Sequence, residues 1–226
     1  RTPMNAIIGF TDLLEQSELT NEQKEHLNLL RDSSHNLLRL IDDILDLSKI
    51  EARKVDVDIV ECSFGQLLNS VESLMLSKAE REGLEFEIIE DAGLPAQIHT
   101  DVIRVRQCLI NLVGNAIKFT REGHIYLKVS LQEIENAPFI RFDVEDTGIG
   151  IPEDKQEKIF DTFVQADSST SREFGGTGLG LAISKRLADL LGGQLTMTSE
   201  VGKGSVFSLI IPAGVDITKQ PFLDRH

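Results

Sequence analysis

The sequence predicts an α+β fold in which an N-terminal helical hairpin is followed by a larger mixed domain. Two observations support this prediction. Apolar residues recur at helical three- and four-residue spacing through residues 1–54, whereas beyond residue 55 short alternating segments are interleaved with helical ones. We therefore expect a helical hairpin at 1–54, a mixed α/β domain at 55–215 and a tail or linker at 216–226.

Composition narrows the class of protein. The 226 residues have room for one or two domains, and their net charge of −14 leaves no basic nucleic-acid footprint. No apolar run approaches the roughly 18 residues that a membrane-spanning helix needs, and no signal peptide opens the chain. The two isolated cysteines, Cys62 and Cys108, suit a reducing cytosol. We expect a cytoplasmic chain that binds no nucleic acid, with any membrane tether outside it.

The hairpin has clear helix signals. Pro3 fits the first turn of a helix, or a kink within a helix that began upstream. The segment Thr20–Gln23 has the pattern of a capping box that starts a second helix. The apolar positions of the first helix are Ile7, Ile8, Phe10, Leu13 and Leu14. Those of the second, at heptad-like spacing, are Leu27, Leu30, Leu37, Ile41 and Ile44. Two helices cannot bury such a stripe alone, so it predicts either dimerisation into a four-helix bundle or packing on the following domain.

The remaining elements follow from periodicity and from glycine and proline positions. Alternation over Val55–Ile59 predicts a strand directly after the hairpin. Pro152 followed by two acids predicts a helix start, and Gly192-Gly193 predicts a helix end. The predicted helices are 64–82, 101–118, 153–160 and 178–191, and the predicted strands are 84–90, 124–133, 139–146, 194–200 and 204–211.

Asn111, Asn115 and Lys118 fall on one face of the predicted helix 101–118, at positions i, i+4 and i+7. A polar stripe on an amphipathic helix is the plain alternative. However, asparagine forms helices less well than the glutamate and lysine that suit a solvated stripe. An amide oxygen is a ligand that Mg²⁺ accepts, and a lysine can contact a phosphate. The three residues are therefore candidates for a metal–phosphate site.

Asp146 comes directly after a predicted strand and begins the segment Asp146–Ile151. An aspartate there can simply form a turn. Its carboxylate can instead accept a hydrogen bond from an exocyclic amine, which would favour adenine over a base that presents a carbonyl. Gly148 and Gly150 would allow the backbone to approach a flat base closely.

A glycine-rich stretch at Gly175–Gly180 leads into the predicted helix 178–191 and overlaps its first residues. This arrangement makes an anion site from free N–H groups. The spacing matches neither the dinucleotide-binding fingerprint nor the P-loop, so both of those folds are excluded. The polar segment Asp167–Arg172 before it is either a lid over a nucleotide or an ordinary surface loop.

The order of these three segments, with Phe160 to Phe163 between the second and the third, closely resembles the catalytic core of sensor histidine kinases. The resemblance implies a Bergerat-type ATP-binding domain, an α/β two-layer sandwich shared with DNA gyrase and heat-shock chaperone ATPases. Those relatives lack the helical hairpin, which favours a kinase over them. A non-enzymatic, dimerising nucleotide-sensor module is the second reading.

The resemblance also implies roles for single residues. Asn115 would hold Mg²⁺ with Asn111 beside it, Lys118 would contact phosphate, and Asp146 would read the adenine amine. Gly148 and Gly150 would shape the base pocket. The lid hinge and phosphate cradle would consist of Gly176, Thr177, Gly178 and Gly180. Phe160 and Phe163 match the family's phenylalanine box, although they could equally be core aromatics.

The family's mechanism transfers the γ-phosphoryl group of ATP to a histidine and then to an aspartate of a response-regulator receiver domain, within a homodimer. The acceptor would lie three positions before the run Arg1-Thr2-Pro3, and none of the histidines present matches its motif. Those histidines are His26, His35, His99, His124 and His226. Thr2 occupies the position where many family members place a residue that orients water for phosphatase action.

Because the expected acceptor lies outside these residues, we predict that the 226-residue chain binds ATP with Mg²⁺ but does not phosphorylate itself. Incubation with γ-labelled ATP, followed by separation of the protein, should leave it without stable label. Acid-labile label on this chain would contradict the prediction.

Overall fold

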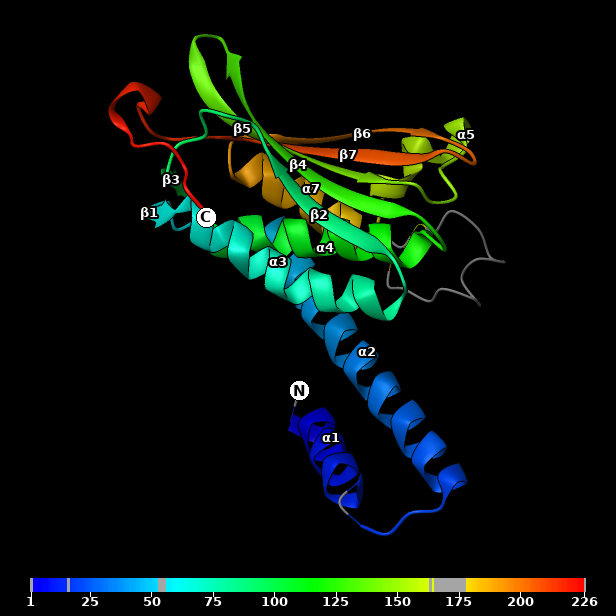
Figure 1. Cartoon of the computed structure of the whole chain (residues 1–226). Coiled ribbons are helices and arrows are strands. Elements are labelled where there is room, and N and C mark those ends of the chain that lie inside the picture. The colour runs from blue at the N-terminus through cyan, green and yellow to red at the C-terminus, as the bar shows by residue number, and fades with distance from the viewer. Residues whose placement is uncertain (1, 16, 53–55, 163, 165–177, 226) are drawn as a thin grey trace. The chain divides into compact units, whose positions relative to one another are not determined.

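The computed structural model describes residues 2–15, 17–52, 56–162, 164 and 178–225 (Figure 1). The chain divides into two compact units, Arg1–Val55 and Asp56–His226. The first unit is the helical hairpin and the second is the mixed domain, so the predicted fold class is confirmed.

The hairpin consists of α1 (Thr2–Glu15) and α2 (Asn21–Glu51). The capping box at the start of α2 is present as predicted, because the Thr20 amide donates to Gln23 Oε1 at 2.9 Å and the Gln23 amide donates to Thr20 Oγ1 at 3.3 Å. An ion pair of 2.7 Å between Arg31 Nη1 and Glu15 Oε2 joins the two helices. Leu27 and Ser34 are buried, but much of the predicted apolar stripe stays exposed.

A five-stranded sheet and three helices form the two layers of the second unit (Figure 1). The strands in sheet order are β2 (Glu85–Glu90), β4 (His124–Ile134), β5 (Ala137–Asp146), β7 (Gly204–Pro212) and β6 (Gln194–Glu200). Only the β2–β4 pair is parallel. One face is covered by α3 (Phe64–Arg81), α4 (Val102–Phe119) and α7 (Gly180–Leu190).

The core lies between these two layers. Alternate residues of the central strands are buried against the helices, among them Leu127, Phe142 and Val144. Phe64 at the start of α3 meets Phe142 edge to face, with ring centroids 5.9 Å apart. The helices and strands of these two layers begin and end within one or two residues of the predicted ranges.

Three predicted details are wrong. The described part of the predicted strand 55–59 is not a strand, and the strand β1 (Val60–Ser63) begins after it. The reason is that the Asp58 amide donates to Asp101 Oδ2 at 3.2 Å instead of to a neighbouring strand. A second strand, β3 (Gln97–Thr100), was not predicted and pairs with β1 in a separate antiparallel sheet. The predicted helix 153–160 is split into α5 (Glu153–Gln156) and a 3₁₀ turn, η1 (Lys158–Phe160).

The segment after β7 returns to the second unit. Following the 3₁₀ turn η2 (Ile217–Lys219), the Ala96 amide donates to the Pro221 carbonyl at 2.8 Å and the Leu223 amide to the Leu94 carbonyl at 2.7 Å. The Arg225 side chain, only 10% exposed, forms ion pairs with Glu72 of α3 and Glu90 of β2. These residues are therefore packed on the domain. Within the described ranges, none of the helices combines the length and the apolarity that crossing a membrane requires.

Candidate functional site

Helix α4 places the three candidate metal and phosphate ligands. Its first turn is capped by Asp101, whose Oδ1 accepts the Ile103 and Arg104 amides, each at 3.1 Å. The side of α4 that carries Leu109 and Leu112 is buried in the core. As predicted, the other side carries the half-buried residues Asn111, Asn115 and Lys118.

Asn111 connects α4 to the first turn of α7. Its Nδ2 donates to Ser184 Oγ at 2.9 Å, and Ser184 is 2% exposed. A Cβ atom added to Gly180 would lie only 2.2 Å from Asn111 Oδ1, so no larger residue fits there without a shift. Sequence reasoning found Gly180 through the glycine motif but missed Ser184, because a small polar residue inside an amphipathic helix gives no signal.

The C-terminal end of α4 meets the segment that begins with Asp146. The Phe119 carbonyl accepts the Ile149 amide at 3.2 Å. A Cβ atom on Gly148 would lie 2.5 Å from the same carbonyl oxygen, which explains why glycine occupies this position. The Lys118 ammonium lies 4.5 Å from the Phe119 ring centroid. The candidate phosphate ligands and the candidate base-reading turn therefore share one end of one helix.

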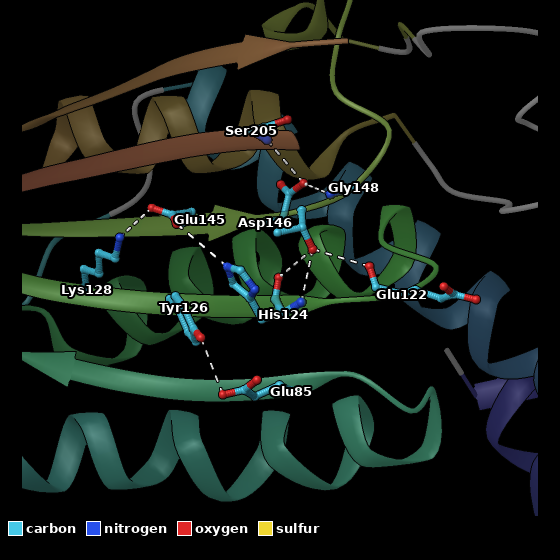
Figure 2. A network of polar contacts seen from close by, with 10 residues as sticks. Glu85, Glu122, His124, Tyr126, Lys128, Glu145, Asp146, Gly148 and Ser205 are labelled. Carbon is cyan, nitrogen blue, oxygen red and sulfur yellow. Dashed lines mark hydrogen bonds and ion pairs between the residues drawn. The ribbon is translucent and has the colours of Figure 1, made fainter. Parts of the chain in front are cut away.

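Asp146 is the last residue of β5, and its side chain is 6% exposed. Its Oδ1 accepts the Gly148 amide at 2.9 Å and the Ser205 amide at 3.3 Å (Figure 2). Both of its hydrogen bonds among the described residues go to Oδ1, which leaves Oδ2 able to accept from a ligand. Burial raises the pKa of this carboxyl above its ordinary 3.8, and the two amide bonds partly oppose the shift.

The β6–β7 hairpin forms the other side of this turn. Gly150 has a φ of 68°, and a Cβ atom there would lie 2.1 Å from the Glu200 carbonyl oxygen. The Gly202 amide donates to the Ile149 carbonyl at 2.9 Å. Glycine at 150 is thus required both by backbone conformation and by close approach of two chain segments.

A row of polar side chains extends from the turn onto the sheet face opposite α3, α4 and α7 (Figure 2). Thr147 Oγ1 accepts the His124 amide at 3.1 Å, and the Thr147 amide donates to the His124 carbonyl at 3.3 Å. Glu145 lies 2.6 Å from the Lys128 ammonium and 3.9 Å from His124 Nε2. These contacts join the turn to the start of β4.

Phe160 lies between the turn and α7. Its ring meets Phe207 of β7 edge to face at 6.5 Å, and the Lys185 ammonium of α7 lies 4.7 Å from its centroid. Of the other predicted site residues, Gly178 is described and has a φ of 67°. Gly176, Thr177, Phe163 and the segment Asp167–Arg172 lie outside the described residues.

The donor set fits a hard cation only if a ligand supplies most of the oxygens. Within the part of the chain that the structure describes, no three His, Cys, Asp or Glu side chains gather where they could hold a metal ion. Asn115 offers one neutral amide oxygen beside Lys118 on the same helix face. Mg²⁺ commonly takes one or two protein ligands together with substrate phosphates and waters, and this arrangement is consistent with that pattern.

Comparison with known proteins identifies the family to which the chain belongs. Residues 1–53 match the model of the His Kinase A (phospho-acceptor) domain. Residues 100–215 match the model of the histidine kinase-, DNA gyrase B- and HSP90-like ATPases. The chain belongs to the histidine kinase family. It has the two domains of a sensor histidine kinase catalytic core, as the resemblance implied.

Individual relatives support the same assignment. The chain is 41% identical over 223 residues to hybrid signal transduction histidine kinase B of Dictyostelium discoideum, covering 98% of this chain and 11% of that protein. It is 42% identical over 214 residues to the aerobic respiration control sensor protein ArcB of Escherichia coli, covering 94% and 27%. The crystal structure of full-length ShkA in complex with AMPPNP aligns with a TM-score of 0.79 at 36% identity, covering 96% and 44%. The chain thus spans about a quarter or less of the length of these curated relatives.

We predict that Asp146→Asn weakens ATP binding by about 10- to 100-fold, which corresponds to ~1.5–3 kcal/mol for a lost charge-assisted hydrogen bond. Asparagine can still accept the Gly148 and Ser205 amides through Oδ1, but an amide group would then face the adenine amine. Calorimetric titration with ATP and Mg²⁺ measures the change. Unchanged affinity would remove Asp146 from the base site.

The same substitution should not destabilise the domain at pH 7. Because burial raises the pKa of Asp146, its contribution to stability is present below its ordinary pKa and is lost as the pH rises through the folded-state pKa. At pH 7 the buried charge therefore costs stability, and we expect the Asn variant to melt at an equal or higher temperature. The difference in melting temperature between the Asn variant and the parent chain should shrink as the pH falls through the folded-state pKa of Asp146.

Proposed function

We propose that this chain binds ATP with Mg²⁺ and supplies the γ-phosphoryl group to a histidine, from which it passes to an aspartate of a response-regulator receiver domain. The observation that carries the proposal is Asp146, a buried carboxylate whose Oδ1 is held by two backbone amides beside a glycine turn. The crystal structure of the relative ShkA was obtained with AMPPNP, an ATP analogue, which supports the same ligand class here.

At the end of the site that would bind the base, Asp146 Oδ2 would accept a hydrogen bond from the exocyclic amine of adenine. A guanine would place a carbonyl oxygen against this carboxylate, and two acceptors facing each other in a desolvated site are unfavourable. Gly148 and Gly150 would bring the backbone close to the ring. The site would therefore prefer adenine nucleotides.

At the phosphate end, Lys118 and the N-terminus of α7 would meet the triphosphate. Helix α7 has 11 residues and begins at Gly180, so its first amides and its dipole favour an anion. Asn115 would hold Mg²⁺, with Asn111 beside it, and the bound metal would neutralise charge on the phosphate oxygens. Gly176, Thr177 and Gly178 would complete the cradle and the lid hinge.

The transfer would be an in-line displacement. The unprotonated imidazole nitrogen attacks the γ-phosphorus and forms a nitrogen–phosphorus bond, while the bond from that phosphorus to the bridging oxygen breaks and its electron pair leaves with ADP. The proton on the other ring nitrogen passes to water. We place the acceptor histidine three positions before Arg1, as the motif implies. We assign Thr2, at the start of α1, to the orientation of water in a phosphatase reaction.

The exposed stripe of α2 supports a homodimer. Leu30, Leu37 and Ile44 follow one another at seven-residue intervals and are 55%, 45% and 46% exposed. A seven-residue apolar repeat left open on a two-helix hairpin is the pattern that a four-helix bundle buries. Four apolar side chains of α1 are exposed as well: Ile7, Phe10, Leu13 and Leu14.

The phosphotransfer proposal can be tested by restoring the acceptor. A three-residue extension before Arg1 that carries histidine first and glutamate second should acquire acid-labile label from γ-labelled ATP. The same extension with alanine in place of histidine should acquire none. An Asn115→Ala form of the histidine-bearing extension should lose label by at least tenfold, because the proposed metal ligand is gone.

The outcomes separate the two readings of the chain. Label that depends on both the added histidine and Asn115 supports the kinase. A histidine-bearing extension that binds ATP and stays unlabelled would instead favour the non-enzymatic nucleotide-sensor module.

We further predict that Leu37→Asp converts the chain from dimer to monomer, because it places a charge in the centre of the apolar stripe. Sedimentation velocity measures the state. The neighbouring exposed Asn36→Asp adds the same charge outside the stripe and should leave the dimer intact. A dimeric Leu37→Asp chain would exclude this stripe from the interface.

A further inference from the structure

We propose that Gln156 and Ser199 are positioning residues for the base: they lock the turn Gly148–Pro152 onto the β6–β7 hairpin and thereby set the orientation of Asp146. The inference rests on the proposed binding of an adenine nucleotide at Asp146. Neither residue belongs to the glycine motifs, and both act through backbone groups of the pocket.

Gln156 is the last residue of α5 and is half-buried. Its Nε2 donates to the Ile151 carbonyl at 3.0 Å and to the Ser199 carbonyl at 3.0 Å. A primary amide has two N–H groups, so one is committed to the turn and the other to β6. A single side chain thus bridges two segments that lie more than 40 positions apart in the sequence.

Ser199 completes the bridge from the other side. Its Oγ accepts the Ile151 amide at 2.8 Å and lies 2.9 Å from the Gly204 carbonyl, to which it can donate. It also lies 3.0 Å from Ser205 Oγ across the β6–β7 ladder. Both backbone polar groups of Ile151 are therefore held by side chains, one by Gln156 and one by Ser199.

The hydrogen bonds of Gln156 and Ser199 affect the ligand site through the β6–β7 hairpin. Ser205, opposite Ser199 in the ladder, donates its amide to Asp146 Oδ1 at 3.3 Å. Gly150 packs against the Glu200 carbonyl, and the Gly202 amide donates to the Ile149 carbonyl at 2.9 Å, so the turn is in direct contact with the hairpin. A shift of the turn away from β6 would therefore displace Gly148, which donates the other bond to Asp146 Oδ1. The carboxylate would lose the orientation that aims Oδ2 at the base.

Gln156→Glu tests this proposal, because glutamate has the same shape but, when ionised, donates no hydrogen bond and sets a carboxylate against two carbonyl oxygens. We expect affinity for ADP to fall by about tenfold, the loss of roughly one net hydrogen bond. Affinity for GDP should change much less, so the preference for adenine should shrink. Simple destabilisation would weaken both nucleotides equally. Ser199→Ala, which removes the acceptor of the Ile151 amide, should shift the ADP/GDP ratio in the same direction.

The affinities for ADP and GDP are measured by calorimetric titration of the full chain, and two control variants are measured in the same way. Gln194→Glu makes the same change at an exposed position of β6 and should leave both affinities unchanged. Lys118→Ala should weaken ATP more than ADP, which separates the phosphate end from the base end. If Gln156→Glu does not fold, the ratio in Ser199→Ala decides the question.

If the parent chain binds ADP and the preference for adenine is unchanged in Gln156→Glu and Ser199→Ala, the inference is overturned and the proposed function still stands. Failure of the parent chain to bind ADP or ATP would overturn both.

Discussion

The buried carboxylate of Asp146 is the constraint on which the rest of the site depends. A charge that is 6% exposed is costly, and burial raises its pKa accordingly. Two backbone amides, from Gly148 and Ser205, offset part of that cost but satisfy only one oxygen. Among the described residues, no hydrogen bond to Oδ2 joins the two at Oδ1, so Oδ2 is the oxygen left for water or a ligand at the end of β5. In the proposed complex, the adenine amine would give Oδ2 a hydrogen bond and offset part of the remaining cost.

Helix α4 connects this carboxylate with the other parts of the pocket. One side of the helix is buried in the core, its end meets the turn through the Phe119 carbonyl, and Asn111 reaches Ser184 in α7. Its N-terminal cap, Asp101, also accepts the Asp58 amide, so the first residues of the second unit are attached to the same helix. Displacement of α4 would consequently change the turn, α7 and this entry segment together.

Local patterns predicted the long elements and the motif residues, but not the contacts that position them. Helices and strands with a complete apolar period, such as α4 and β5, are specified by burial of one face, which a short window of sequence reveals. Val55–Ile59 has a strand period, yet Asp58 is bonded to a side chain 43 positions away. Gln156, Ser199 and Ser184 have common residue types and distant partners, so no local signal marks them. Glycine was informative at 148 and 150 because backbone from another segment occupies the space a Cβ would need.

The two asparagines of α4 show how one motif can divide into two roles. Both lie on the same helix face, four positions apart, and a motif description treats them as equivalent. In the structure Asn111 uses its amide nitrogen on Ser184 and sets its oxygen against Gly180, so it fixes the distance between α4 and the first turn of α7. Asn115 lies one turn closer to Lys118, and for none of the described glycines is it among the nearest neighbours of an added Cβ atom. In the proposed complex, an anion at the α7 N-terminus and Mg²⁺ at Asn115 would have to lie at a fixed separation to share one triphosphate. The contacts of Asn111 with Ser184 and Gly180 would maintain that separation.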